Sequence, residues 1–407
     1  MSGVAEKARF YLERSVPQLR EWEEKEIFTK DELRNIVQKR NDFEHRVLSQ
    51  GNSPADFSDY AKWEQSLDAL RLKRCARLHL RNLSSAHASQ GRVLQIYDRG
   101  VERYPFARDL WLEYLGYMNR VKASKRWRRV MTRALRFMPR DGGLWVMAAR
   151  RSSTNGDMAG ARSLFMRGCR FCVDEGTVWV EYVRCEMEWL QKMDAKKGGG
   201  AKAGSQEAAR DDEDDEDEIR LGGSDSEDED EDGVIARDPD AVGRGSSIKP
   251  KKVFSAETKT QLKHNPALDG AIPMAIFDIS RKQPFFSAAV AERFFDVVAE
   301  FASSVRAAPK ILQHILDAMQ EAYPGSAEAG FCFVRQPVAG ASPFTPEFPR
   351  GLREVYARLQ PTVEASVEKD ALRENLVVWV EGILKLEGLD EAIVTVLEHM
   401  KGLASAG

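Results

Sequence analysis

The chain has 407 residues, of which 43% are hydrophobic and 31% are charged, and its formal net charge of −3 conceals a strong asymmetry. Residues 1–191 carry 35 Lys and Arg against 25 Asp and Glu, a net charge of +10, whereas residues 192–260 carry 12 against 20, a net charge of −8. This length is too great for a single compact core. The five Cys do not make a disulfide framework, which favours a reducing compartment, and no apolar run approaches the ~20 residues of a membrane span.

The segment 4–48 has the pattern of helices. Thr29 is followed three positions later by Glu32, the arrangement of a capping box, so we expect a helix to begin there. That helix ends with Arg40, Phe43 and Glu44, and a second apolar segment follows from Phe57. We interpret these two segments as the first helical hairpin of a repeat array.

A constant interval dominates the segment 92–186. Trp111, Trp145 and Trp179 are equally spaced, and an apolar or aromatic residue precedes each Trp at one fixed offset. Their spacing matches the period of about 34 residues that is typical of arrays in which each unit is a helical hairpin that cannot bury its apolar face alone. The predicted repeat core consists of Phe43, Phe57, Tyr60, Trp63, Tyr97, Trp111, Tyr114, Trp145, Phe165, Trp179 and Tyr182.

The clearest unit comprises Ala161–Phe165 followed by Trp179, Tyr182 and Glu186. It resembles the half-a-tetratricopeptide (HAT) repeat, in which the Trp opens the second helix, whereas the tetratricopeptide repeat has its Trp early in the first helix. The resemblance implies an all-α fold, a right-handed superhelical solenoid of helical hairpins. We expect a helical N-terminal module (1–39), HAT repeats (40–191), a disordered acidic linker (192–268) and degenerate helical repeats (269–407).

The linker is predicted from two acidic runs, residues 211–218 and 227–232, which cannot bury enough apolar surface to offset chain entropy. Ser224 and Ser226 each have a Glu three positions later, which resembles the substrate sites of acidophilic kinases. A regulated linker and a merely solvated acidic linker both fit this pattern.

Three N-terminal segments carry a more specific resemblance: residues 5–13, 28–33 and 40–46. They are similar to the N-terminus of the U3 small nucleolar RNA-associated protein 6 family. The resemblance implies a scaffold subunit of the UTP-B subcomplex in the small-subunit processome of the nucleolus. The implied partners are the other UTP-B subunits, which are WD-repeat proteins, and the U3 snoRNP with its pre-rRNA. A HAT array alone would also fit scaffolds of mRNA splicing or 3′-end processing.

The sequence predicts no catalytic, cofactor or metal site. It lacks the His-Glu-x-x-His and Gly-x-Ser-x-Gly patterns and any phosphate-binding glycine loop. Cys169 and Cys172 have a metal-like spacing, but no second Cys pair completes a tetrahedral site, so we expect both in the repeat core.

The candidate binding residues lie in a basic stretch, residues 120–140, which contains nine Lys and Arg and no Asp or Glu. Arg128 and Arg133 match repeat positions and are expected to brace neighbouring helices. The other seven are expected to point outward and to contact RNA phosphates or an acidic partner: Arg120, Lys122, Lys125, Arg126, Arg129, Arg136 and Arg140. The alternative is a charged surface with no dedicated partner.

Overall fold

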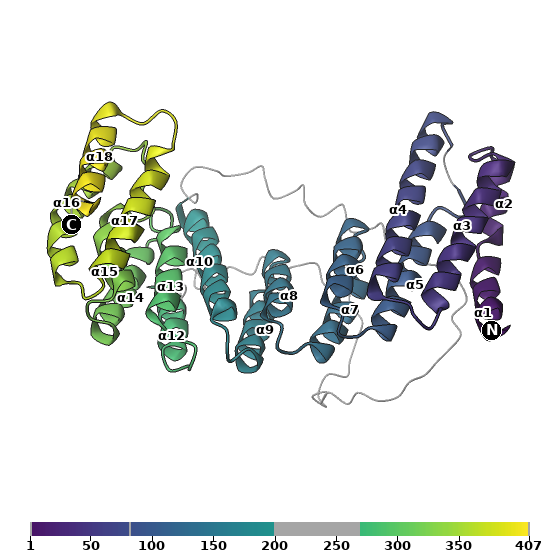
Figure 1. Ribbon diagram of the computed structural model, residues 1–407, viewed down its shortest axis with the longest axis horizontal. Helices are drawn as coiled ribbons and strands as arrows, with labels where there is room; N and C mark the ends of the chain where they lie inside the picture. The colour runs from purple at the N-terminus through teal and green to yellow at the C-terminus, as the bar shows by residue number, and fades with distance from the viewer. Residues whose placement is uncertain (1, 81–82, 199–268, 406–407) are drawn as a thin grey trace. The chain divides into compact units, whose positions relative to one another are not determined.

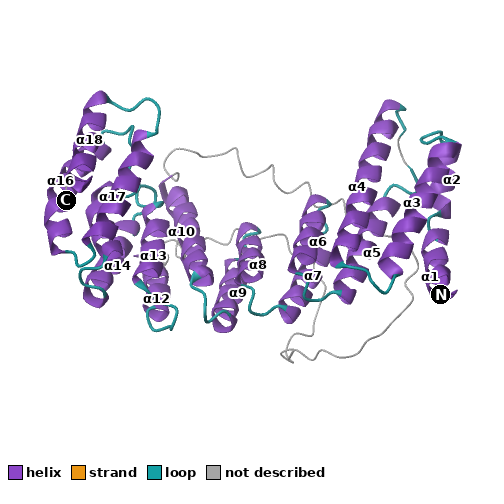
Figure 2. Cartoon of the chain, viewed as in Figure 1, coloured by secondary structure: helices purple, strands orange, loops and turns teal. Residues whose placement is uncertain are grey.

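The computed structural model describes residues 2–80, 83–198 and 269–405, and every regular element in these ranges is a helix (Figures 1 and 2). The all-α helical repeat fold expected from the sequence is confirmed. Most of the predicted acidic linker, with Ser224 and Ser226, lies outside the described residues.

The first compact unit comprises residues 1–139. Its helices are α1 (Ser2–Glu13), α2 (Val16–Glu24), α3 (Lys30–Leu48), α4 (Pro54–Arg77), α5 (Ala88–Arg103), α6 (Arg108–Arg120) and α7 (Ser124–Phe137). Consecutive helices pack against each other as hairpins, α3 with α4 and α5 with α6, and α4 also packs against α5. Each hairpin therefore buries part of its apolar surface against the next one.

The second compact unit begins at Arg140. Its helices are α8 (Gly142–Thr154), α9 (Met158–Phe171), α10 (Thr177–Gly198), α12 (Ala271–Ser280), α13 (Ala288–Ala299), α14 (Ala308–Ala322), α15 (Ala327–Arg335), the 3-10 helix η3 (Gln336–Val338), α16 (Glu347–Ala365), α17 (Lys369–Leu384) and α18 (Glu391–Ser405). Helix α10 continues through residues 192–198, which the sequence assigns to the linker, and it packs against α12 and α13. The units divide within the range 40–191 that the sequence assigns to one HAT array, and the four-part division stays a prediction.

Local sequence explains where the helices begin and end. The capping box at the start of α3 is present: the Thr29 N–H donates to Glu32 Oε2 at 2.9 Å, and the Glu32 N–H donates to Thr29 Oγ1 at 3.3 Å. Helices α5 and α7 each end directly before a residue–proline pair, Tyr104–Pro105 and Met138–Pro139. Proline has no N–H to continue the helical ladder, so the chain turns at these points.

Stacked aromatic side chains join the two helices in each of three hairpins. The rings of Phe43 and Tyr60 stack at 5.0 Å, those of Tyr97 and Tyr114 at 5.3 Å, and those of Phe165 and Tyr182 at 4.9 Å. All of the predicted repeat-core residues are buried except Phe43 and Trp63, which are half-buried. The sequence period thus corresponds to a repeated contact inside each hairpin.

The repeated Trp residues pack against phenylalanines that come later in the chain. Trp111 contacts Phe137, Trp145 stacks on Phe171 at an interplanar angle of 7°, and Trp179 contacts Phe285. This is core packing and inter-hairpin packing, so the Trp rings themselves are not available to a ligand.

Candidate functional site

Two three-residue networks join successive hairpins of the first unit. Glu44 accepts hydrogen bonds from the Tyr60 hydroxyl (3.0 Å) and from Arg99 (2.8 and 3.0 Å). Asp98 occupies the same place in the next hairpin, where it accepts from the Tyr114 hydroxyl (2.8 Å) and from Arg126. Each network combines an acid, a Tyr of the same hairpin and an Arg from a later helix.

Burial raises the pKa of Tyr60 and of Tyr114, and the neighbouring carboxylates raise it further. Both hydroxyls therefore remain protonated and act as donors. Because Arg126 completes the second network, the prediction that it points outward to a partner is wrong: it is an internal brace.

A second kind of brace is a salt bridge inside the hairpin. Arg40 donates two hydrogen bonds to Glu64 (2.7 and 3.0 Å), and Arg162 donates two to Glu186 (2.7 and 2.8 Å), at the same sequence separation in both cases. Leu94 and Met118 occupy the same two positions in the hairpin of α5 and α6, and both are buried. One hairpin has therefore replaced the ion pair by an apolar pair.

In the hairpin of α7 and α8, Arg128 occupies the position of Arg162. Ser152 occupies the position of Glu186, so this hairpin has no acid to pair with Arg128. Arg128 is exposed and forms no ion pair with any residue in the described ranges, so the predicted bracing role for Arg128 is wrong. Arg133, by contrast, lies 3.4 Å from Glu102 and over the ring of Trp111.

Four cations share the outer face of α7, and we refer to them as the α7 stripe: Lys125, Arg128, Arg129 and Arg136. Their helical spacing gathers them on one face. The opposite face carries the buried residues Trp127, Val130 and Ala134. Helix α7 contains no acidic residue, and Arg128, Arg129 and Arg136 have no ion pair within the described part of the chain. The stripe is therefore a surface that can bind successive phosphates or carboxylates.

The remaining predicted binding residues are not part of helix α7. Arg120 donates to Gln65 Oε1 at 2.8 Å and lies over the ring of Tyr117. Lys122 is exposed in the turn between α6 and α7, where its φ of 56° is in the left-handed region. Arg140 is exposed and belongs to the second unit, where its carbonyl accepts a hydrogen bond from Cys172 Sγ at 3.4 Å.

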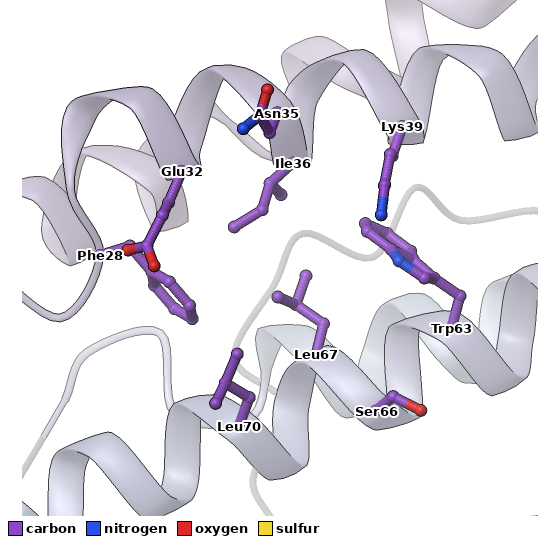
Figure 3. A pocket seen from close by; sticks show the side chains of 9 residues that line it. All are labelled: Phe28, Glu32, Asn35, Ile36, Lys39, Trp63, Ser66, Leu67 and Leu70. Atoms are coloured by element: carbon purple, nitrogen blue, oxygen red, sulfur yellow. The ribbon is translucent and has the colours of Figure 1, made fainter.

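An open groove lies between α3 and α4 (Figure 3) and was not foreseen from the sequence. Its volume is about 310 Å³, and both apolar and polar side chains line it. The lining residues are Phe28, Glu32, Asn35, Ile36, Lys39, Trp63, Ser66, Leu67 and Leu70. Leu70 continues the apolar face of α4 but is 42% exposed. Its place on that apolar face is the sequence feature that could have indicated the groove. The groove can accept an apolar side chain.

The N-terminal part of the chain matches a known protein family. Residues 12–95 match the family model of U3 small nucleolar RNA-associated protein 6. The resemblance found in the N-terminal segments is confirmed by this match. The matched range contains the groove, the Arg40–Glu64 salt bridge and the Glu44 carboxylate, whereas α7 lies beyond it.

Curated relatives carry the same family name. A U3 small nucleolar RNA-associated protein 6 from Schizosaccharomyces pombe is 32% identical over 196 residues, which cover 47% of this chain and 40% of that protein. The human homolog of U3 small nucleolar RNA-associated protein 6 is 25% identical over 203 residues, which cover 49% of this chain and 34% of that protein. The chain thus spans less than half of the length of these relatives.

The cysteines of the candidate metal spacing are buried and do not form a reactive centre. Burial raises the pKa of Cys169 to about 12 and that of Cys172 to about 11, so both thiols are protonated at neutral pH. Within residues 2–80, 83–198 and 269–405, no three His, Cys, Asp or Glu side chains gather in a way that could hold a metal ion. None of the helices in those ranges is long and apolar enough to cross a membrane.

Proposed function

We propose that this chain is a non-catalytic scaffold of the nucleolar small-subunit processome, which acts with the U3 snoRNP in the processing of pre-18S rRNA. The observation that carries the proposal is the match of residues 12–95 to the U3 small nucleolar RNA-associated protein 6 family. The partners would be other UTP-B subunits, which are WD-repeat proteins, and the U3 snoRNP with its pre-rRNA.

The packing of the hairpins supports a binding role for a physical reason. Successive hairpins packed side by side present long, rigid surfaces, and the internal braces hold these surfaces in place. A scaffold of splicing or 3′-end processing would share the hairpins, but the family match lies in the N-terminal module and first hairpins, which favours the U3-associated assembly.

A second candidate function is direct contact with RNA through the α7 stripe. Arg128, Arg129 and Arg136 are exposed on a helix without acids and have no ion pair within the described residues, so they can neutralise up to three phosphates. For single-stranded nucleic acid, each neutralised phosphate contributes about −0.7 to the slope of log affinity against log salt, so three contacts predict a slope of about −2. This contact would be independent of base sequence.

Affinity purification of the tagged full chain from nucleolar extract tests both functions. The test variant changes each residue of the α7 stripe to Glu and leaves Arg126 in place, because Arg126 braces the fold. The matched control makes the same change in net charge at four exposed cations of the second unit: Lys310, Arg350, Arg353 and Lys369. The co-purified proteins and U3 RNA are then quantified, and RNA binding by the purified chain is measured at low and moderate salt.

If the chain is a scaffold whose stripe contacts RNA, the stripe variant loses RNA binding in vitro and keeps its protein partners, while the control variant keeps both. Loss of the partners with intact RNA binding would instead assign the stripe to an acidic protein surface. Failure of the unmodified chain to recover U3 RNA or processome proteins would overturn the scaffold proposal.

A further inference from the structure

Phe106 has a solvent-exposed aromatic ring. It lies in the turn between α5 and α6 and is 75% exposed. A single exposed apolar side chain is ordinary at a protein surface, so what surrounds this ring decides whether it can form a site.

The repeat register shows that packing does not require an aromatic residue at this position. The equivalent residues of the other three hairpins are Asn52, Arg140 and Asp174, all of them polar. The turn can therefore be built without Phe, and Phe106 is a feature of this hairpin alone among the four.

A second exposed ring lies beside it. Phe137, the last residue of α7, is 40% exposed, and its ring centroid is 6.3 Å from that of Phe106 at an interplanar angle of 82°. Phe137 also packs against the buried Trp111, with 6.2 Å between ring centroids. Trp111 thus holds Phe137 in place, and Phe137 supports the more exposed ring of Phe106.

Basic residues neighbour both rings in the chain. Phe137 directly follows Arg136 of the α7 stripe, and Phe106 lies between Arg103 and Arg108 in the chain. Two acids, Glu102 and Asp109, lie close to Phe106 in the chain. Glu102 pairs with Arg133, and Asp109 lies in the first turn of α6. Exposed aromatic faces beside a row of exposed cations are the arrangement by which proteins hold single-stranded nucleic acid: the cations follow the phosphates and the rings stack on unpaired bases.

We propose that Phe106, supported by Phe137, is a base-stacking site for single-stranded RNA whose phosphates lie along the α7 stripe. The site rests on the RNA contact proposed above and adds to it a preference for unpaired over base-paired RNA. Bases in a duplex are stacked on each other and cannot offer a face to Phe106. Stacking is tolerant of base identity, because every base has a π-face.

The test measures fluorescence anisotropy of the full chain with a labelled oligoadenylate and with an RNA duplex of the same length. Phe106→Ala is expected to weaken single-strand binding by about five- to thirtyfold, the lower range for loss of one stacked base, and to leave duplex binding unchanged. Phe106→Trp is expected to keep single-strand affinity, whereas Phe106→Leu, which is apolar without a π-face, is expected to behave as Phe106→Ala.

Three controls accompany these variants. Phe344→Ala removes a ring that is 60% exposed in the segment before α16, between the uncharged residues Pro343 and Thr345, and is expected to change nothing. Because Phe106 is exposed, Phe106→Ala should also leave thermal unfolding unchanged, which separates a binding defect from a folding defect. An oligodeoxyadenylate should show the same loss as the RNA, since stacking contacts the base and not the 2′-hydroxyl.

The stacking proposal is overturned if Phe106→Ala weakens single-strand and duplex binding equally, if Phe106→Leu binds as well as the unmodified chain, or if the loss is confined to RNA. Unchanged single-strand binding by Phe106→Ala, together with lost binding by the stripe variant, would refute stacking and leave the phosphate contact standing. An unmodified chain that binds neither probe would refute both.

Discussion

The salt bridge between Arg40 and Glu64 offers the sharpest test of the packing argument, because the chain contains its own apolar alternative. The two side chains are 0% and 1% exposed, and two hydrogen bonds of 2.7 and 3.0 Å join them. Arg92 approaches the same carboxylate at 3.8 Å. Glu64→Met would therefore leave two guanidinium groups in a nearly dry environment without their acid.

The expected cost of Glu64→Met is about 3–5 kcal/mol in the free energy of unfolding, the range for breaking a buried ion pair by removing one partner. The double variant Arg40→Leu with Glu64→Met copies Leu94 and Met118, which occupy these positions in the next hairpin. Replacing both partners by apolar residues is often neutral or stabilising. Because Arg92 still loses its carboxylate, we expect the double variant to recover only about 2 kcal/mol relative to the sum of the single variants.

The measurement is urea unfolding followed by far-UV circular dichroism, with hydrogen exchange of α3 and α4 to locate the change in the first unit. Arg162→Leu with Glu186→Met provides the comparison in the second unit, where Arg162 is 28% exposed and the penalty for breaking the pair should be smaller. The reasoning is refuted if the double variant of Arg40 and Glu64 is as unstable as the two single losses added together.

Three further results are expected. Trp145→Ala should destabilise the second unit by about 3–5 kcal/mol, since the ring is buried and stacked on Phe171; an unchanged thermal transition would contradict this burial. Burial acts to raise the pKa of Glu21, but hydrogen bonds from Ser85 and Ser84 outweigh it and lower the pKa to about 2. The stability from Glu21 is therefore complete above its usual pKa of 4.5 and is lost as the pH falls toward 2; acid unfolding of Glu21→Gln should lack this component, and identical acid profiles would contradict it. Deleting residues 205–247 should leave helical content and melting unchanged and should strengthen RNA binding at low salt, because the acidic runs no longer compete for the stripe; loss of cooperative melting would show that the segment is structural.

The sequence by itself determined the elements and their repetition. The aromatic pairs that recur at fixed offsets from the evenly spaced Trp residues make contacts that are local to each hairpin, whereas the Trp rings pack against phenylalanines later in the chain. The local pairs therefore leave a regular pattern in the sequence, and this pattern identifies the residues that stack inside the hairpin. The capping box of α3 was predictable for the same reason, since both of its hydrogen bonds join residues three positions apart.

The tertiary structure alone decided which cations brace the fold and which face solvent. Arg126 and Arg128 are both basic residues of α7, two positions apart, and the repeat pattern assigned the bracing role to Arg128. The structure assigns it to Arg126, because the side chains of Asp98 and Tyr114 lie within hydrogen-bonding reach of that guanidinium. The choice depends on which face α7 turns to the preceding hairpin, and the buried residues Trp127, Val130 and Ala134, rather than the charges, mark the face of α7 that lies in the core. The exposure of Phe106 was likewise decided by the tertiary structure. The sequence shows where Phe106 lies in the chain, but its exposure depends on how the turn between α5 and α6 packs against the end of α7.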